Sequence, residues 1–122
     1  MNIHKSAEDY LEMILMLQKE KGFARSVDIA LSLSVSKPSV SVAMKKLREN
    51  GYILMDAENL ITLTEPGQAI AERMYRRHTV LTEMLVRLGV NEVTAREDAC
   101  KIEHDLSDES FAAIEKHINL YR

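Results

Sequence analysis

Two short helical patterns separated by a tight turn constrain the fold of this chain more than any other feature. Apolar residues recur at helical spacing over residues 26–33, and the polar residue Ser34 interrupts the pattern. A new helical pattern begins near Ser36, with Pro38 in its first turn, where a missing N–H costs nothing. The sequence therefore predicts a short helix, a tight turn and a second helix over residues 26–50.

Strand patterns follow this helical pair. The apolar runs 52–54 and 60–63 flank the polar stretch 56–59, which is typical of two strands joined by a turn. Residues 6–21 show helical spacing and predict a helix before the pair. A helix, a helix-turn-helix and a hairpin in this order form a winged helix-turn-helix, which we expect over residues 1–63.

The outer face of the predicted helix 36–50 is small, hydroxylated and basic. In a winged helix this face enters the major groove of DNA, where serine hydroxyls pair with bases, Val42 meets a thymine methyl and lysines neutralise phosphates. The first two turns lack Arg, Asn and Gln, so we expect a large share of shape readout. A solvated helix face without a partner is the alternative. The residues predicted to bind DNA are Ser36, Lys37, Pro38, Ser39, Ser41, Val42, Lys45 and Lys46.

The rest of the chain is helical in pattern. A long amphipathic stretch follows Thr64 and ends at Gly89, and two shorter helical patterns come after it. Aromatic residues make up only 5% of the chain, Trp is absent and Met occurs seven times, which suits helix packing better than a sandwich of sheets. We therefore expect a mainly α fold, with a helical metal-binding and dimerisation domain over residues 64–122.

The last helical pattern carries an apolar stripe. Its large side chains recur three or four residues apart, and we expect them to be too extensive to remain in water on a single chain. The stripe therefore predicts a homodimer, and a homodimer predicts a palindromic site in double-stranded DNA. The residues assigned to the dimer surface are Phe111, Ile114, Ile118 and Tyr121.

Several classes of protein are excluded by what the sequence lacks. No apolar run approaches the ~20 residues that span a bilayer, and the N-terminus has no signal-peptide core. The single cysteine, Cys100, forms no internal disulfide, so we expect a cytoplasmic protein without a membrane partner. A net charge of −3 leaves room for a local basic face only. With four Gly and no phosphate loop or nucleophile motif, we expect no organic cofactor and no enzyme activity. The alternative is a small metal- or thiol-dependent enzyme that uses Cys100 and His104.

Three potential metal ligands share one face of the penultimate helical pattern. Cys100, Glu103 and His104 are spaced i, i+3 and i+4, which places them on one side of an α-helix. A thiolate, imidazoles and carboxylates from separate helices together suit a transition metal. The candidates on other helices are Asp9, Glu12 and His78.

Each candidate also has an ordinary structural role. Asp9 can accept the backbone N–H of Ser6 in a capping box, and Glu12 can be a solvated charge. A histidine on an apolar stripe, such as His78, is often a hydrogen-bonded core residue, and a lone cysteine is often a small buried hydrophobe. The spacing alone therefore suggests a metal site without proving one.

Four motifs, taken together, resemble those of the diphtheria toxin repressor and manganese transport regulator family. They stand in the same order and at compatible spacing over nearly the whole chain. The resemblance implies a cytoplasmic, homodimeric transcriptional repressor that a metal ion activates and that controls metal homeostasis. It also implies that the SH3-like third domain of the iron-responsive branch is absent. The motifs are Ser6–Glu12, Ser36–Val40, Arg77–His78 and Ala99–His104.

The resemblance implies one set of metal ligands drawn from both predicted domains, with Glu103 as a bridge if two ions bind. One or two ions per subunit are therefore expected. The acids at positions 9 and 12 match the manganese branch, whereas Cys100 matches the iron branch. Carboxylates suit Mn²⁺ and a thiolate favours Fe²⁺, Co²⁺ or Zn²⁺, so we expect Mn²⁺ with Fe²⁺ close behind. The implied ligands are Asp9, Glu12, His78, Cys100, Glu103 and His104.

A metal ion held by both domains would join them. It would favour the arrangement in which the two recognition helices of a dimer reach successive major grooves, and so promote binding to operator DNA. The alternative is a winged-helix regulator that ignores metals and responds to a small organic effector.

Overall fold

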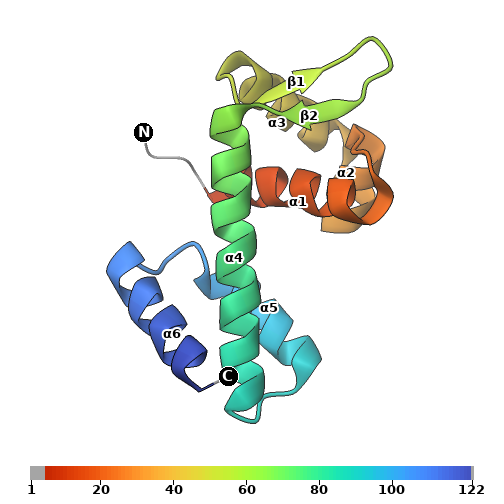
Figure 1. Ribbon diagram of the computed structural model, residues 1–122. Coiled ribbons are helices and arrows are strands. Elements are labelled where there is room, and N and C mark those ends of the chain that lie inside the picture. The colour runs from red at the N-terminus through yellow and green to blue at the C-terminus, as the bar shows by residue number, and fades with distance from the viewer. Residues whose placement is uncertain (1–4, 122) are drawn as a thin grey trace. The chain divides into compact units, whose positions relative to one another are not determined.

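A computed structural model describes residues 5–121, and the chain divides into two compact units between Arg73 and Met74. The division falls inside a long helix (Figure 1). In chain order, the described residues form α1 Lys5–Lys21, α2 Ser26–Leu33, α3 Lys37–Glu49, β1 Ile53–Met55, β2 Ile61–Leu63, α4 Glu65–Arg87, α5 Glu92–Ile102 and α6 Asp108–Leu120. The predicted mainly α fold is confirmed.

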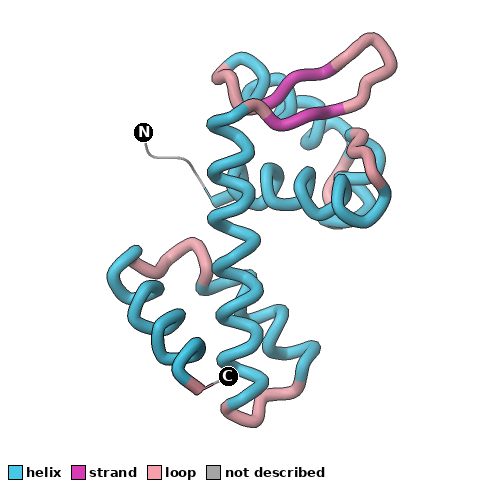
Figure 2. Tube along the Cα trace, in the orientation of Figure 1, coloured by secondary structure: helices cyan, strands magenta, loops and turns pink. Residues whose placement is uncertain are grey.

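The N-terminal unit is built around α1. This helix packs against α2, α3 and β2, and the strand pair, magenta in Figure 2, follows α3. The apolar residues that gave the helical patterns are buried here, because each helix turns one stripe inward. The fully or almost fully buried members of this core include Leu11, Ile14, Ile29, Val40, Met44, Ile53 and Ile61.

The tight turn between α2 and α3 depends on two serines. Ser34 has a φ of 55°, in the left-handed region that ends a helix. Ser36 is the N-cap of α3, and its side-chain oxygen accepts a hydrogen bond from the backbone N–H of Ser39 at 3.2 Å. The helix-turn-helix predicted over residues 26–50 is therefore present.

The two strands form an antiparallel hairpin in which Ile53 pairs with Leu63. The strands lie one residue from the predicted runs at three of their four ends. The Asp56 carboxylate holds the connecting turn, because its Oδ1 accepts hydrogen bonds from the backbone N–H groups of Glu58 at 2.8 Å and Leu60 at 3.0 Å. The winged helix-turn-helix is thus complete.

The start of α4 is locked to the residues that precede β1. Thr64 donates its hydroxyl proton to the carbonyl oxygen of Gly51 at 2.6 Å, and its backbone N–H bonds the carbonyl oxygen of Tyr52 at 3.0 Å. At Gly67, a Cβ atom would lie 2.0 Å from the Tyr52 oxygen. Only glycine allows this approach of two backbones.

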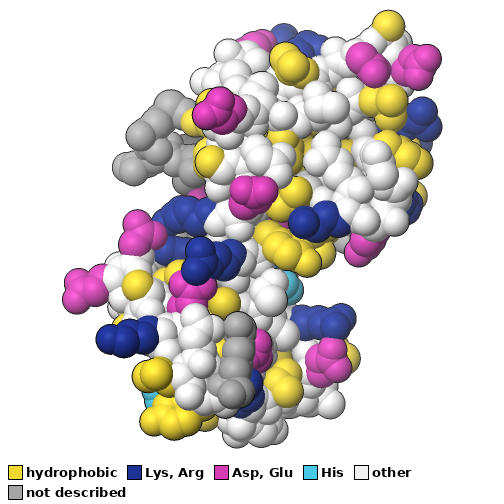
Figure 3. All heavy atoms as spheres, viewed as in Figure 1, with side chains coloured by type: hydrophobic (Ala, Val, Ile, Leu, Met, Phe, Trp, Pro, Cys, Tyr) yellow, Lys and Arg dark blue, Asp and Glu magenta, His cyan; other side chains and the backbone are white. Residues whose placement is uncertain are grey.

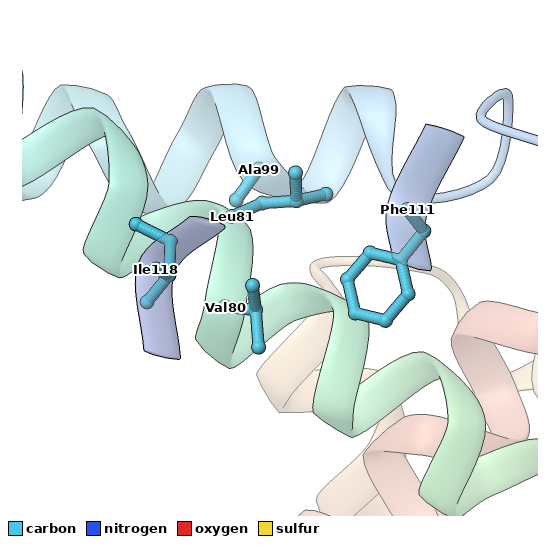
Figure 4. Packing of buried hydrophobic residues seen from close by; sticks show 5 residues of the cluster. All are labelled: Val80, Leu81, Ala99, Phe111 and Ile118. Atoms are coloured by element: carbon cyan, nitrogen blue, oxygen red, sulfur yellow. The ribbon is translucent and has the colours of Figure 1, made fainter. Parts of the chain in front are cut away.

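The C-terminal unit has its own apolar core, formed by the end of α4 with α5 and α6 (Figure 4). Val80 and Leu81 come from α4, Ala99 from α5, and Phe111 and Ile118 from α6. Met84, Ile102, Leu106 and Ile114 pack against this cluster from positions that are only partly buried. The core therefore uses the apolar stripes of all three helices.

This core corrects the predicted dimer surface. Phe111 and Ile118 are only 9% and 4% exposed, and Ile114 packs against the same cluster, so the stripe is covered by its own chain. Of the four residues assigned to the dimer surface, only Tyr121 is largely exposed, at 69%. The prediction was wrong for Phe111 and Ile118, because an apolar stripe looks the same in sequence whether its own chain or a partner covers it. For Ile114, which is only partly buried, and for Tyr121 it stays a prediction.

Candidate metal centre

Three donor groups from two helices meet within the C-terminal unit. α4 contributes His78, and α5 with the turn after it contributes Cys100 and Glu103. His78 Nδ1 lies 3.2 Å from Glu103 Oε2 and 3.6 Å from Cys100 Sγ. One donor atom from each residue lies within 4.8 Å of the other two. We call His78, Cys100 and Glu103 the donor cluster.

The spacing of the donor cluster fits a divalent ion. Ligand atoms about 2.0–2.3 Å from one ion, at tetrahedral or octahedral angles, lie about 3–4 Å apart. The distances from His78 Nδ1 to Glu103 Oε2 and to Cys100 Sγ, 3.2 and 3.6 Å, fall in this interval. One imidazole, one thiol and one carboxylate also form a donor set that transition metals accept.

Glu103 lies just beyond the last residue of α5 and still follows the helix. Its φ and ψ are −59° and −27°, and its backbone N–H bonds the carbonyl oxygen of Ala99 at 3.0 Å. The predicted i, i+3 placement of Cys100 and Glu103 on one face therefore holds. His104 falls in the turn that follows, rather than on the helix.

The Glu103 carboxylate is fully buried between two imidazoles. Its Oε2 faces His78 Nδ1, and its Oε1 lies 3.5 Å from His104 Nε2. The His104 side chain is itself only 2% exposed. A buried carboxylate is costly unless positive charge or a metal compensates it, so these three side chains form an arrangement that a cation would stabilise.

A buried arginine donates hydrogen bonds to the backbone of the segment that carries Glu103 and His104. Arg77 is 1% exposed, and its guanidinium donates to the backbone carbonyl oxygens of Glu103 at 2.9 Å and Leu106 at 2.7 Å. Arg77 was predicted only as a member of the motif Arg77–His78, with no role of its own. Its signal was available, because Arg77 lies three and four residues before Val80 and Leu81, on the apolar stripe of α4.

The two acids predicted in the first helix lie in the N-terminal unit. Asp9 and Glu12 are three residues apart on α1; Glu12 is buried and Asp9 partly buried. Ser6 lies inside α1 rather than at its N-cap, so the capping-box alternative for Asp9 does not apply. That these acids join the donor cluster in binding one metal stays a prediction.

The candidate DNA-binding residues lie on one exposed surface. α3 turns Val40, Met44 and Leu47 into the core, which leaves its other side in solvent. All eight of these residues are exposed: Ser36, Lys37, Pro38, Ser39, Ser41, Val42, Lys45 and Lys46. We call them the recognition surface. Their exposure fits the predicted role, and contact with DNA stays a prediction.

Both halves of the sequence match a known family. The family model described as "Iron dependent repressor, N-terminal DNA binding domain" matches residues 2–58. The model described as "Iron dependent repressor, metal binding and dimerisation domain" matches residues 64–121. The predicted domain boundary at residues 63 and 64 lies between these matches, whereas the compact units divide inside α4.

Two curated relatives carry the same name. The HTH-type transcriptional regulator MntR of Geobacillus thermodenitrificans (strain NG80-2) is 41% identical over 102 residues, which is 84% of this chain and 72% of the relative. The protein of that name from Lysinibacillus sphaericus (strain C3-41) is 39% identical over 102 residues, 84% of this chain and 73% of the relative.

Solved structures show the same likeness. The structure of the manganese regulator SloR is similar with a TM-score of 0.80 and 34% identity, over 98% of this chain and 55% of SloR. A manganese-dependent transcriptional repressor in complex with manganese is similar with a TM-score of 0.84 and 31% identity, over 93% of this chain and 52% of that repressor. The IdeR protein of T. acidophilum is similar with a TM-score of 0.83 and 28% identity, over 98% of this chain and 55% of IdeR.

This chain spans about half the length of each of these solved structures. Within residues 5–121, no helix combines the length and apolar character that crossing a bilayer requires. The resemblance drawn from four sequence motifs is confirmed, and the relatives are transcriptional regulators. The chain belongs to the iron-dependent repressor family of metal-dependent transcriptional regulators.

Proposed function

We propose that this chain is a manganese-responsive repressor, acting in the cytoplasm as a homodimer on palindromic operator DNA, and that it controls metal homeostasis. The observation that carries the proposal is the donor cluster, which offers an imidazole, a thiol and a carboxylate at metal-ligand spacing. The exposed recognition surface on α3 supports the DNA-binding half of the proposal.

In the proposed mechanism, Glu103 and His104 hold their donor atoms in a buried position and His78 presents an imidazole from α4. Asp9 and Glu12 would contribute carboxylates from α1. A divalent ion, when bound, would supply the positive charge that compensates these acids. Because α1 packs against α3, anchoring α1 restricts the recognition helix to the arrangement that fits DNA.

The choice of metal follows from the donor atoms. Mn²⁺ is the weakest binder of the first-row series, so carboxylates rather than the thiol must favour it. Asp9, Glu12 and Glu103 provide three carboxylates against one thiol from Cys100. We therefore propose Mn²⁺ as the activating ion, with one or two ions per subunit, and Fe²⁺ as the competitor that the thiol favours.

We also propose that a second copy of the chain covers the apolar side chains that the C-terminal unit leaves in solvent. Leu88, Leu120 and Tyr121 are 74%, 70% and 69% exposed, and hydrophobic side chains lie open at the lower end of this unit in Figure 3. The match to a dimerisation domain supports a second copy as the occupant. Sedimentation velocity should give twice the 13.9 kDa of one chain, and a monomer at working concentration would contradict this part.

The experiment that tests the function measures DNA binding with and without Mn²⁺. A duplex selected from a random pool in the presence of Mn²⁺ is labelled, and its affinity is measured by fluorescence anisotropy. We expect Mn²⁺ to raise the affinity of the unmodified chain by roughly 5–150-fold, the usual range of allosteric coupling. Glu103→Ala should remove this response.

The matched control is Glu109→Ala, which removes an exposed carboxylate from the first turn of α6. This variant should respond to Mn²⁺ as the unmodified chain does. A Glu103→Ala protein that keeps its full response would contradict the proposed mechanism. A chelator that leaves the affinity of the unmodified chain unchanged would point to a metal-independent regulator.

A further inference from the structure

Arg77 carries a charge in the interior of the C-terminal unit. Its side chain is 2% exposed, and its neighbours on α4 at helical spacing are the core residues Val80 and Leu81. Burying a guanidinium costs several kcal/mol unless it is paired and hydrogen-bonded, so a chain that keeps one here uses it for specific contacts.

The contacts of Arg77 converge on one segment. Nη1 donates to the carbonyl oxygens of Glu103 at 2.9 Å and Leu106 at 2.7 Å, and Nη2 donates to Asp108 Oδ1 at 2.7 Å. The guanidinium carbon also lies 5.2 Å from the centre of the Phe111 ring. These bonds fix three points between the end of α5 and the start of α6.

This segment carries two of the proposed metal ligands. Glu103 is itself one of the three fixed points, and His104 lies between it and Leu106. Arg77 and His78 are neighbours on α4. The same helix therefore carries one proposed ligand, His78, and the guanidinium that holds the segment with the ligands Glu103 and His104. The planar fork of arginine sets several donors in fixed directions, which a single ammonium group does not.

We infer that Arg77 is the positioning residue of the metal centre: by holding the Glu103 backbone and the following turn, it sets where the Glu103 carboxylate and the His104 imidazole present their donor atoms. This inference rests on the proposed function. It concerns a residue that touches no metal and acts only through the ligands it holds.

The neighbouring arginine provides a matched control. Arg76 forms an ion pair with Glu115, so it also ties α4 to α6, but this contact lies outside residues 103–108. If Arg77 only held the helices together, replacing either arginine would have the same kind of effect on metal binding. If Arg77 positions the ligands, the two replacements differ.

The experiment compares Arg77→Lys with Arg76→Lys in the full chain. Mn²⁺ affinity is measured from the electron paramagnetic resonance signal of free Mn²⁺, and the visible absorption of bound Co²⁺ reports the ligand geometry. Unfolding in urea without metal measures the stability of each variant. We expect Arg77→Lys to bind Mn²⁺ roughly 10–100-fold more weakly and to change the Co²⁺ spectrum. Arg76→Lys should change neither.

Two results would overturn the inference. One is a folded Arg77→Lys protein with the Mn²⁺ affinity and Co²⁺ spectrum of the unmodified chain. The other is a loss of affinity that the two lysine variants share in proportion to their lost stability, with an unchanged Co²⁺ spectrum.

If Arg77→Lys does not fold, Asp108→Asn decides the question. Asp108 is 83% exposed, so its replacement weakens one anchor of the arginine without opening the core. Weaker Mn²⁺ binding with an altered Co²⁺ spectrum supports the inference, and unchanged values overturn it. Failure of the proposed function looks different, because the unmodified chain would then bind Mn²⁺ and Co²⁺ no better than Glu103→Ala.

Discussion

The recognition surface and the metal centre place their polar residues in opposite environments. Along α3 the polar side chains lie in water, and only apolar residues such as Val40 and Met44 are buried. In the C-terminal unit, Arg77 and Glu103 are completely or almost completely buried, and the His104 side chain is only 2% exposed. The exposed basic surface is stable in water and can bind a charged partner. The buried Glu103 carboxylate costs free energy unless a cation compensates its charge.

This difference determines how each region responds to change. Most residues of the recognition surface can be replaced with little effect on folding, because their side chains are exposed in the free chain; the exception is Ser36, which caps α3. Residues of the metal centre share contacts with the core, so their replacement affects both metal binding and stability. The predictions below separate these effects, and they are ordered by expected size.

The largest effect is expected at Phe111, which Figure 4 shows in the core of the C-terminal unit. Phe111→Ala should lower the free energy of unfolding by about 3–5 kcal/mol, because it leaves a cavity in packed helices. Chemical denaturation measures this change. The control is Val93→Ala, which shortens a side chain that is 65% exposed and lies outside the proposed dimer surface, and it should cost far less. Equal losses in the two variants would restore the dimer-surface interpretation of Phe111.

The next effect concerns DNA. The double variant Lys45→Ala and Lys46→Ala should make the negative slope of log affinity against log salt concentration less steep, by about 2. The reason is that each phosphate contact contributes about −0.9 to this slope. Mn²⁺ binding should be unchanged, since both lysines lie on the exposed side of α3. Anisotropy titrations at several salt concentrations measure the slope. An unchanged slope would mean that these lysines do not contact phosphates.

A third effect concerns the exposed thiol of the donor cluster. Cys100 is exposed and lies 3.6 Å from His78, so its alkylation should be easy without metal and slow once the sulfur binds an ion. At ten times the dissociation constant, Mn²⁺ should slow the reaction with N-ethylmaleimide about tenfold. Mass spectrometry follows the modification. Glu103→Ala should lose the protection, and an unprotected thiol in the unmodified chain would exclude Cys100 sulfur as a ligand.

The smallest effect compares one helix cap from each region. Ser36 caps α3 and Ser107 caps α6, and each accepts a backbone N–H, at 3.2 Å from Ser39 and at 3.0 Å from Ser110. Replacing either serine by alanine should cost about 1 kcal/mol of stability. Only Ser36→Ala should also weaken DNA binding, because Ser36 belongs to the recognition surface. Equal effects on DNA affinity would contradict that assignment.

The sequence predicts the N-terminal fold well because its signals are local. Ser34 ends α2 in the left-handed conformation, and Ser36 caps the start of α3. The two strands coincide closely with short apolar runs in the sequence. The spacing of Cys100 and Glu103 likewise survives in the structure, because a helix imposes its period on its neighbours.

Long-range contacts could not be predicted in the same way. Periodicity alone does not distinguish an apolar stripe covered by α4 and α5 from one covered by a partner, so Phe111 and Ile118 were assigned to the wrong surface. The place of Arg77 on the apolar stripe of α4 indicates burial, but its carbonyl partners could not be predicted, because they lie 26 and 29 residues away along the chain. The sequence does not show which helix or which partner covers a given apolar stripe or buried charge.

The most direct test is a crystal of the protein grown with Mn²⁺ and measured at the manganese absorption edge. We expect an anomalous peak about 2.0–2.3 Å from the Glu103 carboxylate and from an imidazole of His78 or His104, with Asp9 also bound to the ion. A stoichiometric manganese complex with no peak at Glu103, and with Asp9 and Glu103 turned away from each other, would contradict the central claim.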